Sequence, residues 1–110
     1  MDLQIDHQET NGIKEISVSG EIDAYTAPQL RKELLPLMEH AGTAVTVDLT
    51  GVQYMDSTGL GVFVAALKSS KKNECSLNLK GMNRRVKRLF DITGLAEFME
   101  IDSEVKEGKS

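Results

Sequence analysis

The residues best suited to chemistry stand together in one short segment, Asp56-Ser57-Thr58-Gly59. The segment follows an apolar stretch and opens an apolar run of helical character, so we predict that Ser57 is the N-cap of a helix. A helix N-terminus favours negative charge, and a phosphate added there would be tolerated. The segment therefore offers a candidate phosphorylation site at Ser57, with Thr58 as a less favoured second acceptor. On the local sequence alone, an ordinary N-cap is the simpler interpretation of Ser57.

Two glycines, Gly59 and Gly61, follow Ser57 within the first turns of the predicted helix. Each costs a helix about 1 kcal/mol relative to alanine, so something must compensate. Close packing of the helix on a sheet is one explanation. Open access to the backbone for the active site of a partner is the other, and the sequence leaves both open.

An alternative role for Ser57 is that of a nucleophile in a serine hydrolase. A nucleophile elbow requires glycine two residues before the serine, and that position holds Met55. A triad also requires a positioned base, and the only histidines are His7 and His40, which we expect at the surface. A kinase substrate needs no base of its own, because the kinase supplies it. We therefore expect no enzymatic activity and no cofactor.

Three aspartates, Asp23, Asp48 and Asp56, are candidate metal ligands. We expect Asp23 and Asp48 near the ends of different strands, so their convergence in space stays open. Aspartates at such positions more often accept hydrogen bonds in caps and turns. The sequence therefore predicts no metal site.

Three motifs resemble, in order and spacing, those of the bacterial anti-sigma-factor antagonists, the small single-domain members of the STAS group. The motifs are Gly20-Glu21-Ile22-Asp23 with Ala27-Pro28, the run from Met55 to Val62, and the run from Arg88 to Leu95. Together they account for nearly the whole chain and leave only the ends unmatched. The details look closest to the general-stress, sigma-B-type branch rather than the sporulation branch.

The resemblance implies a partner switch. The unphosphorylated protein would bind an anti-sigma factor that is also a serine kinase, and so release a sigma factor. Phosphorylation at Ser57 would end that complex, and a metal-dependent serine phosphatase would reset it. The resemblance also implies a face for partner binding, formed by Asp23, Asp56, Thr58, Gly59, Leu60 and Gly61. A STAS scaffold module that is not phosphorylated remains an alternative.

The composition fits an ordinary folded domain and excludes several classes of partner. With 110 residues, 40% hydrophobic and 27% charged, we expect one domain over residues 1–110, with 103–110 as a flexible tail. The net charge of −4 argues against nucleic acid as a partner. No apolar run approaches the roughly 20 residues of a membrane span, and the first residues do not resemble a signal peptide. With the single Cys75, these features favour a cytoplasmic protein.

The only basic cluster comprises Arg84, Arg85, Lys87 and Arg88. We expect these residues on the solvated face of a helix, although an acidic partner remains an alternative. Nucleic acid is disfavoured because no aromatic residues are interleaved with the charges.

The apolar pattern predicts strands that alternate with helices, hence an α/β domain with a mixed sheet. Asn11-Gly12 predicts a hairpin, and a turn is expected at Thr50-Gly51. Thr26 is expected to cap a first helix, which Pro36 should kink or break.

The two later helices also have clear signals. We expect the second helix to bury the face formed by Leu60, Phe63, Val64 and Leu67. The third should begin at the cap Asn83 and end at Gly94 in the left-handed conformation. A short last element is expected around Phe98, Met99 and Ile101.

Overall fold

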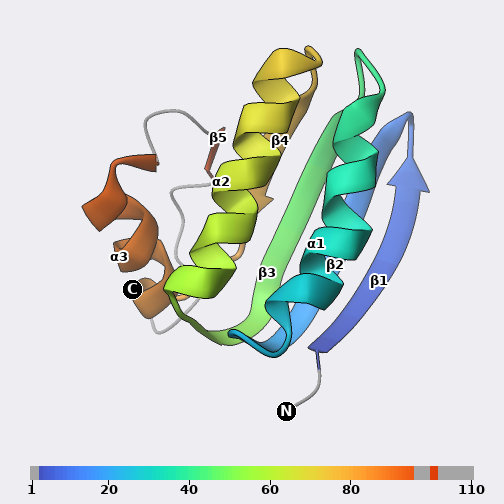
Figure 1. The fold of residues 1–110 in the computed structure, drawn as a ribbon. Coiled ribbons are helices and arrows are strands. Elements are labelled where there is room, and N and C mark those ends of the chain that lie inside the picture. The colour runs from blue at the N-terminus through green and yellow to red at the C-terminus, as the bar shows by residue number, and fades with distance from the viewer. Residues whose placement is uncertain (1–2, 96–99, 102–110) are drawn as a thin grey trace.

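A mixed five-stranded sheet in the order β1-β2-β3-β4-β5 forms the framework of the fold (Figure 1). We analyse it in a computed structural model that describes residues 3–95 and 100–101. The strands are β1 (Leu3–Thr10), β2 (Ile13–Ile22), β3 (Ala44–Met55), β4 (Ser76–Lys80) and β5 (Glu100–Ile101). β1 is antiparallel to β2, whereas the pairs β2–β3, β3–β4 and β4–β5 are parallel. The predicted α/β fold with a mixed sheet is confirmed.

The hairpin between β1 and β2 forms where the sequence predicts it. Asn11 and Gly12 both have positive φ, 54° and 81°, as a type I′ turn requires. β1 lies at the edge of the sheet and pairs along its whole length, from Leu3 opposite Gly20 to Thr10 opposite Ile13.

The turn predicted at Thr50-Gly51 is wrong, because β3 continues through both residues to Met55. The register between β2 and β3 shifts here, so that Ser17 faces Asp48 but Ser19 faces Gly51. A Cβ at Gly51 would lie 2.5 Å from the Cβ of Ser19, so the glycine allows the two strands to approach at this irregularity.

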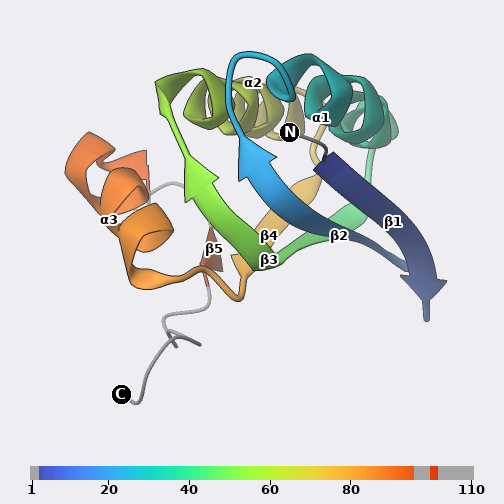
Figure 2. The same cartoon turned by 90° about the horizontal axis from the view of Figure 1, so that it is seen from below.

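One face of the sheet is apolar and is covered by two helices, α1 (Ala27–Leu34) and α2 (Ser57–Lys72) (Figure 2). Alternate strand residues point into this layer, including Ile16, Val47 and Leu79, each at most 1% exposed. α1 stops before Pro36, and a 3₁₀ segment, η1 (Leu35–Glu39), follows it. The proline therefore breaks the helix as predicted, since it cannot donate the next helical hydrogen bond.

The face that α2 buries differs slightly from the prediction. Leu60, Phe63 and Leu67 are buried, but Val64 is only half-buried. Val62 takes its place in the core, at 5% exposed.

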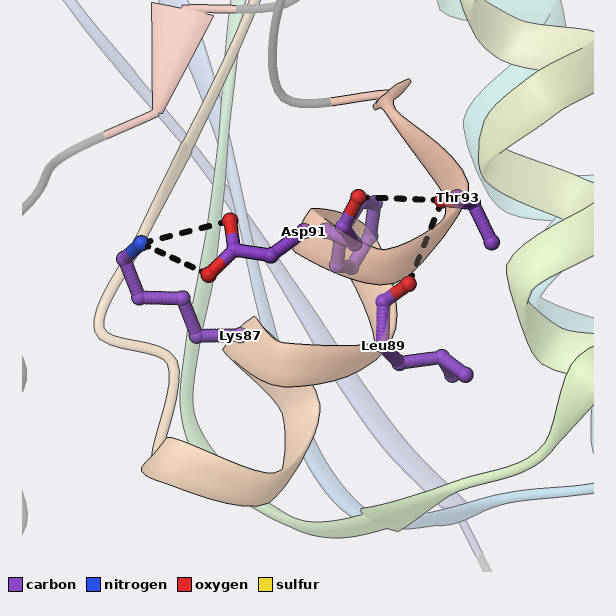
Figure 3. Close-up of polar contacts among 5 residues, drawn as sticks. Lys87, Leu89, Asp91 and Thr93 are labelled. Atoms are coloured by element: carbon purple, nitrogen blue, oxygen red, sulfur yellow. Dashed lines mark hydrogen bonds and ion pairs between the residues drawn. The ribbon is translucent and has the colours of Figure 1, made fainter.

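The third helix, α3 (Arg84–Thr93), begins and ends as predicted. Asn83 accepts from the amide of Val86, and Gly94 closes the helix with φ of 78°. The Thr93 hydroxyl donates to the carbonyls of Leu89 and Phe90 in the last turn (Figure 3). The predicted last element lies partly outside the described residues, as do Phe98, Met99 and residues 103–110; only β5 is described there.

Aromatic packing joins α3 to α2. The rings of Phe63 and Phe90 meet edge to face, with centroids 5.7 Å apart. The amide of Asn83 also donates to the carbonyl of Val52, 3.3 Å away, so the start of α3 is tied to β3.

Candidate functional site

The candidate site lies where the parallel strands β2 and β3 end side by side. Their last residues, Ile22 and Met55, are paired in register. Just beyond this pair, the amide of Asp56 donates to the carbonyl of Ile22 over 3.1 Å. The strands therefore place Asp23 and Asp56, which follow them, next to each other at one edge of the sheet.

The predicted N-cap is wrong by one residue, because Asp56 caps α2 and Ser57 is its first residue. Asp56 has extended backbone angles, and its Oδ1 accepts from the amide of Gly59 over 3.1 Å. Aspartate caps as well as serine does, and its negative charge also interacts favourably with the helix dipole.

Because Asp56 is the cap, the Ser57 side chain is not needed to cap α2. Ser57 is exposed, and its hydroxyl has no hydrogen-bond partner among the described residues. The hydroxyl lies on the first turn of a helix of 16 residues, where a negative charge is favoured. The serine is therefore accessible to another protein.

A second aspartate cap lies at the end of β2. Oδ1 of Asp23 accepts from the amides of Tyr25 and Thr26, while the Asp23 amide donates to the Thr26 hydroxyl over 2.9 Å. This reciprocal pairing over three residues has the pattern of a capping box. Thr26 is the N-cap residue of α1, as predicted. Its hydroxyl makes no capping hydrogen bond to the helix and instead donates to the carbonyl of Glu21 over 2.7 Å.

The electrostatics of Asp23 follow from these contacts. Burial raises the pKa of its carboxyl group, but hydrogen bonds from the Thr26 and Tyr25 amides and the Thr26 hydroxyl outweigh that effect. The pKa of Asp23 is therefore held below its usual value, and the carboxylate is the stable form at neutral pH.

The two glycines of α2 have different explanations, and the sequence had left both open. A Cβ on Gly59 would lie 2.5 Å from Cγ2 of Ile22 and 2.9 Å from Cγ of Met55, the last residues of β2 and β3. Gly59 thus allows α2 to pack closely on both strand ends. A Cβ on Gly61 would meet nothing within 4 Å, so this glycine leaves the surface open.

A hollow of about 370 Å³ lies between the starts of α1 and α2. Its walls are mostly apolar or uncharged, and the one charged side chain is Arg31. The residues that line it are Ala24, Ala27, Pro28, Arg31, Thr58, Gly61 and Val62. Thr58 joins this hollow directly to the Ser57 segment.

Tyr25 is a surface feature that the sequence analysis missed. Its side chain is 90% exposed, although it lies between the half-buried Asp23 and the buried Thr26. The spacing of Asp23 and Thr26 is the available signal, since a capping box there would place Tyr25 in a short helical turn.

The predicted partner-binding residues divide into two groups in the structure. Thr58 and Gly61 are exposed, and Asp23 and Asp56 are half-buried. Gly59 and Leu60 are buried, Leu60 at 7% exposed, so they support this surface from below.

The geometry does not favour the hydrolase alternative. Nε2 of His7 lies 2.7 Å from Oε1 of Glu33, and His40 follows η1; neither contacts the Ser57 hydroxyl. The expected position of Asp48 at a strand end is wrong, because it lies within β3 and accepts from the Thr50 amide. Among the described residues, no group of three acidic, histidine or cysteine side chains could hold a metal ion.

The basic cluster lies on the first two turns of α3. Arg84, Arg85 and Arg88 are exposed, while Lys87 is half-buried and contacts both carboxylate oxygens of Asp91 at 3.3 and 3.4 Å (Figure 3). The arrangement is compatible with the predicted solvated face.

Comparison with known proteins gives a consistent result. The STAS domain family model matches residues 4–108. The anti-sigma-B factor antagonist of Bacillus subtilis is 43% identical over 108 residues, covering 98% of each chain. That of Listeria monocytogenes is 48% identical over 99 residues, covering 90% of this chain and 86% of the relative.

Solved structures share the fold. An anti-sigma factor antagonist from Mycobacterium paratuberculosis is 24% identical and superposes with a TM-score of 0.83, covering 96% of this chain and 90% of its own. The Bacillus cell fate determinant SpoIIAA in its phosphorylated form is 18% identical, with a TM-score of 0.70 over 94% of this chain and 93% of its own.

No helix among the described residues is long and apolar enough to cross a membrane.

Proposed function

This chain belongs to the STAS domain family and is an anti-sigma-factor antagonist of the sigma-B type, and we propose that phosphorylation of Ser57 switches it. The unphosphorylated protein binds an anti-sigma factor that is also a serine kinase, and a sigma factor is released. Phosphorylation ends this complex, and a metal-dependent serine phosphatase restores it. The protein works in the cytoplasm as a regulator and has no catalytic activity of its own.

The observation that carries the proposal is the freedom of the Ser57 hydroxyl. Asp56 performs the cap, so Ser57 can react without loss of a structural hydrogen bond. In the reaction the γ-phosphoryl group passes from ATP to Oγ, ADP leaves, and the hydroxyl proton goes to a base of the kinase. This chain therefore needs no base beside Ser57.

The likeness to a phosphorylated protein of the same fold also supports a switch by phosphorylation. A phosphate adds a charge of about −1.5 to −2 to a chain whose net charge is −4. The helix N-terminus stabilises that charge by about 0.3–1 kcal/mol, and the neighbouring Asp56 offsets part of this by repulsion. The fold should change little, whereas an interface that must desolvate the phosphate could lose several kcal/mol.

Peptide mapping after phosphorylation tests the proposal. The purified anti-sigma factor from the same organism is incubated with this protein, ATP and magnesium, and the products are analysed by mass spectrometry. We expect one phosphate on the wild type and on the matched control Thr58→Ala, and none on Ser57→Ala. Full modification of Ser57→Ala would contradict the proposal.

We expect the same variant, Ser57→Ala, to remain permanently in the form that binds the anti-sigma factor. Ser57→Ala removes the phosphate acceptor and little contact area. It should therefore bind the anti-sigma factor as the unphosphorylated wild type does, and keep that affinity after incubation with ATP. A loss of binding on incubation would show that another residue carries the switch.

A further inference from the structure

The most exposed large apolar side chain among the described residues is Tyr25, at 90%; Ile92 follows at 74%, and Tyr54 and Ile13 are near 45%. The ring of Tyr25 therefore contributes almost nothing to the core. Tyrosine is one of the residue types that carry most of the energy in protein interfaces, because it offers a large contact area with few rotatable bonds.

The backbone that presents Tyr25 is firmly held. The Tyr25 amide donates to Oδ1 of Asp23 over 3.0 Å, and the capping box fixes the next residue, Thr26, which is 4% exposed. Presentation from an ordered turn lowers the entropy cost of binding. The Asp23 carboxylate is thus engaged within the chain, where it positions the tyrosine.

The hollow between α1 and α2 begins beside this turn. Ala24, the neighbour of Tyr25, lines it, and Thr58, the neighbour of Ser57, lines it from the other side. A stable interface covers about 800 Å² of each partner. A partner that covers Ser57 over such an area is expected to cover the hollow as well, because the wall of the hollow begins at the next residue, Thr58.

We propose that Tyr25 and this hollow form the apolar anchor for the anti-sigma factor, which inserts an apolar side chain between α1 and α2. The proposal rests on the function proposed above. Arg31 is the charged residue in the wall, so an acidic residue of the anti-sigma factor is expected beside the inserted side chain. Asp23 acts as a positioning residue that holds the turn.

Calorimetric titration with the purified anti-sigma factor tests the anchor. A central aromatic contact is worth about 2 kcal/mol, so Tyr25→Ala should weaken binding roughly thirtyfold, at 1.4 kcal/mol per decade. Tyr25→Phe should bind within about threefold of the wild type, because the ring is retained. The matched control is Ile13→Ala, at the opposite end of β2, which should leave the affinity unchanged.

Three further variants separate the hollow and the turn from the ring. Gly61→Leu fills the hollow without a clash for its Cβ and should weaken binding at least tenfold while the protein stays folded. Asp23→Asn keeps an acceptor for the turn and should bind better than Asp23→Ala. Equal losses for these two Asp23 variants would mean that the charge contacts the partner, against the positioning role.

Kinetics of phosphorylation give an independent readout. Tyr25→Ala should raise the KM of the kinase for this protein and leave kcat unchanged, because the tyrosine contributes to docking and not to the transfer. A fall in kcat with unchanged KM would overturn the anchor.

The outcomes also separate this inference from the function on which it rests. If the wild type does not bind the anti-sigma factor, the proposed function itself fails. If the wild type binds and folded Tyr25→Ala binds within threefold of it, the anchor alone fails. A wild-type dimer in sedimentation that Tyr25→Ala dissociates would assign the surface to a second copy of this chain, and would overturn the proposal.

Discussion

The two junctions at the ends of β2 and β3 are built alike but present different side chains. In each, an aspartate follows the strand and its Oδ1 accepts backbone amides of the next turn. The large exposed side chain beyond Asp23 is Tyr25, whereas the exposed residue that directly follows Asp56 is Ser57. The same arrangement, an aspartate that accepts backbone amides, therefore orders the backbone at both junctions. The junctions differ in the exposed side chain that follows the aspartate.

The junctions also differ in how they are held. The Asp23 turn has hydrogen bonds in both directions between Asp23 and Thr26, whereas the carboxylate of Asp56 accepts a single bond, from the amide of Gly59. The second junction depends more on packing, since Gly59 sits against Ile22 and Met55. At the second junction, substitutions should therefore lower stability mainly by disturbing packing contacts. At the first junction, they should lower it mainly by removing hydrogen bonds.

The largest expected effect comes from the buried face of α2, on which the second junction depends. Leu67→Ala removes a side chain that is 8% exposed and should cost about 2–5 kcal/mol of the free energy of unfolding. Val64→Ala, half-buried on the same helix, should cost clearly less. Denaturant melts measure both, and a loss under about 1 kcal/mol for Leu67→Ala would mean that this face is not the support we describe.

Gly59→Ala should come next, because it adds a methyl group where Ile22 and Met55 leave no room. We expect a loss of about 1–3 kcal/mol. Gly61→Ala is the matched control, and it should stabilise the fold by up to about 1 kcal/mol through its higher helix propensity. Equal thermal stabilities of the two variants would contradict the claim that Gly59 is closely packed whereas Gly61 faces open space.

The caps themselves should have smaller effects. Asp56→Ala should destabilise the protein by about 1 kcal/mol, as is usual for loss of an N-cap. Asp23→Ala should destabilise it more, because two hydrogen bonds from backbone amides are lost in place of one. Parallel urea melts decide the order, and the reverse order would indicate that Asp56 is the better-held cap.

The smallest effect concerns pH. The pKa of Asp23 is lower in the folded protein than its ordinary value of 3.8, which applies to the unfolded chain. Its contribution is therefore present above that value and is lost as the pH falls through the lower folded pKa. The stability advantage of the wild type over Asp23→Asn should be constant near neutral pH and narrow below about pH 4. An advantage that persists unchanged at pH 2 would show that ionisation of Asp23 does not stabilise the turn.

Much of the fold could be predicted because its signals are local. Asn11-Gly12, Pro36, Asn83 and Gly94 each specify a backbone conformation almost alone, and all four act as expected. Thr50-Gly51 also has the composition of a turn, but there the pairing of β3 with β2 prevails over local preference. Tertiary pairing is not visible in a window of a few residues.

The site was harder to predict because it depends on small displacements. Asp56 and Ser57 are both good caps, and the sequence analysis assigned the cap to Ser57, whereas Asp56 is the cap in the structure. The two glycines had equal local cost, and only the positions of Ile22 and Met55 separate their roles. Tyr25 was missed because the spacing of Asp23 and Thr26 was not recognised as a capping box, and because the exposure of the ring itself depends on packing.

The most direct test of the account compares the unphosphorylated protein with the form phosphorylated at Ser57. Calorimetric affinity for the anti-sigma factor, melting temperature and far-UV circular dichroism are measured for both. We predict a loss of roughly a hundredfold or more in affinity, with an unchanged spectrum and a stability within about 1 kcal/mol. A phosphorylated protein that unfolds, or that binds as tightly as before, would contradict a switch that acts only at the surface of the second junction.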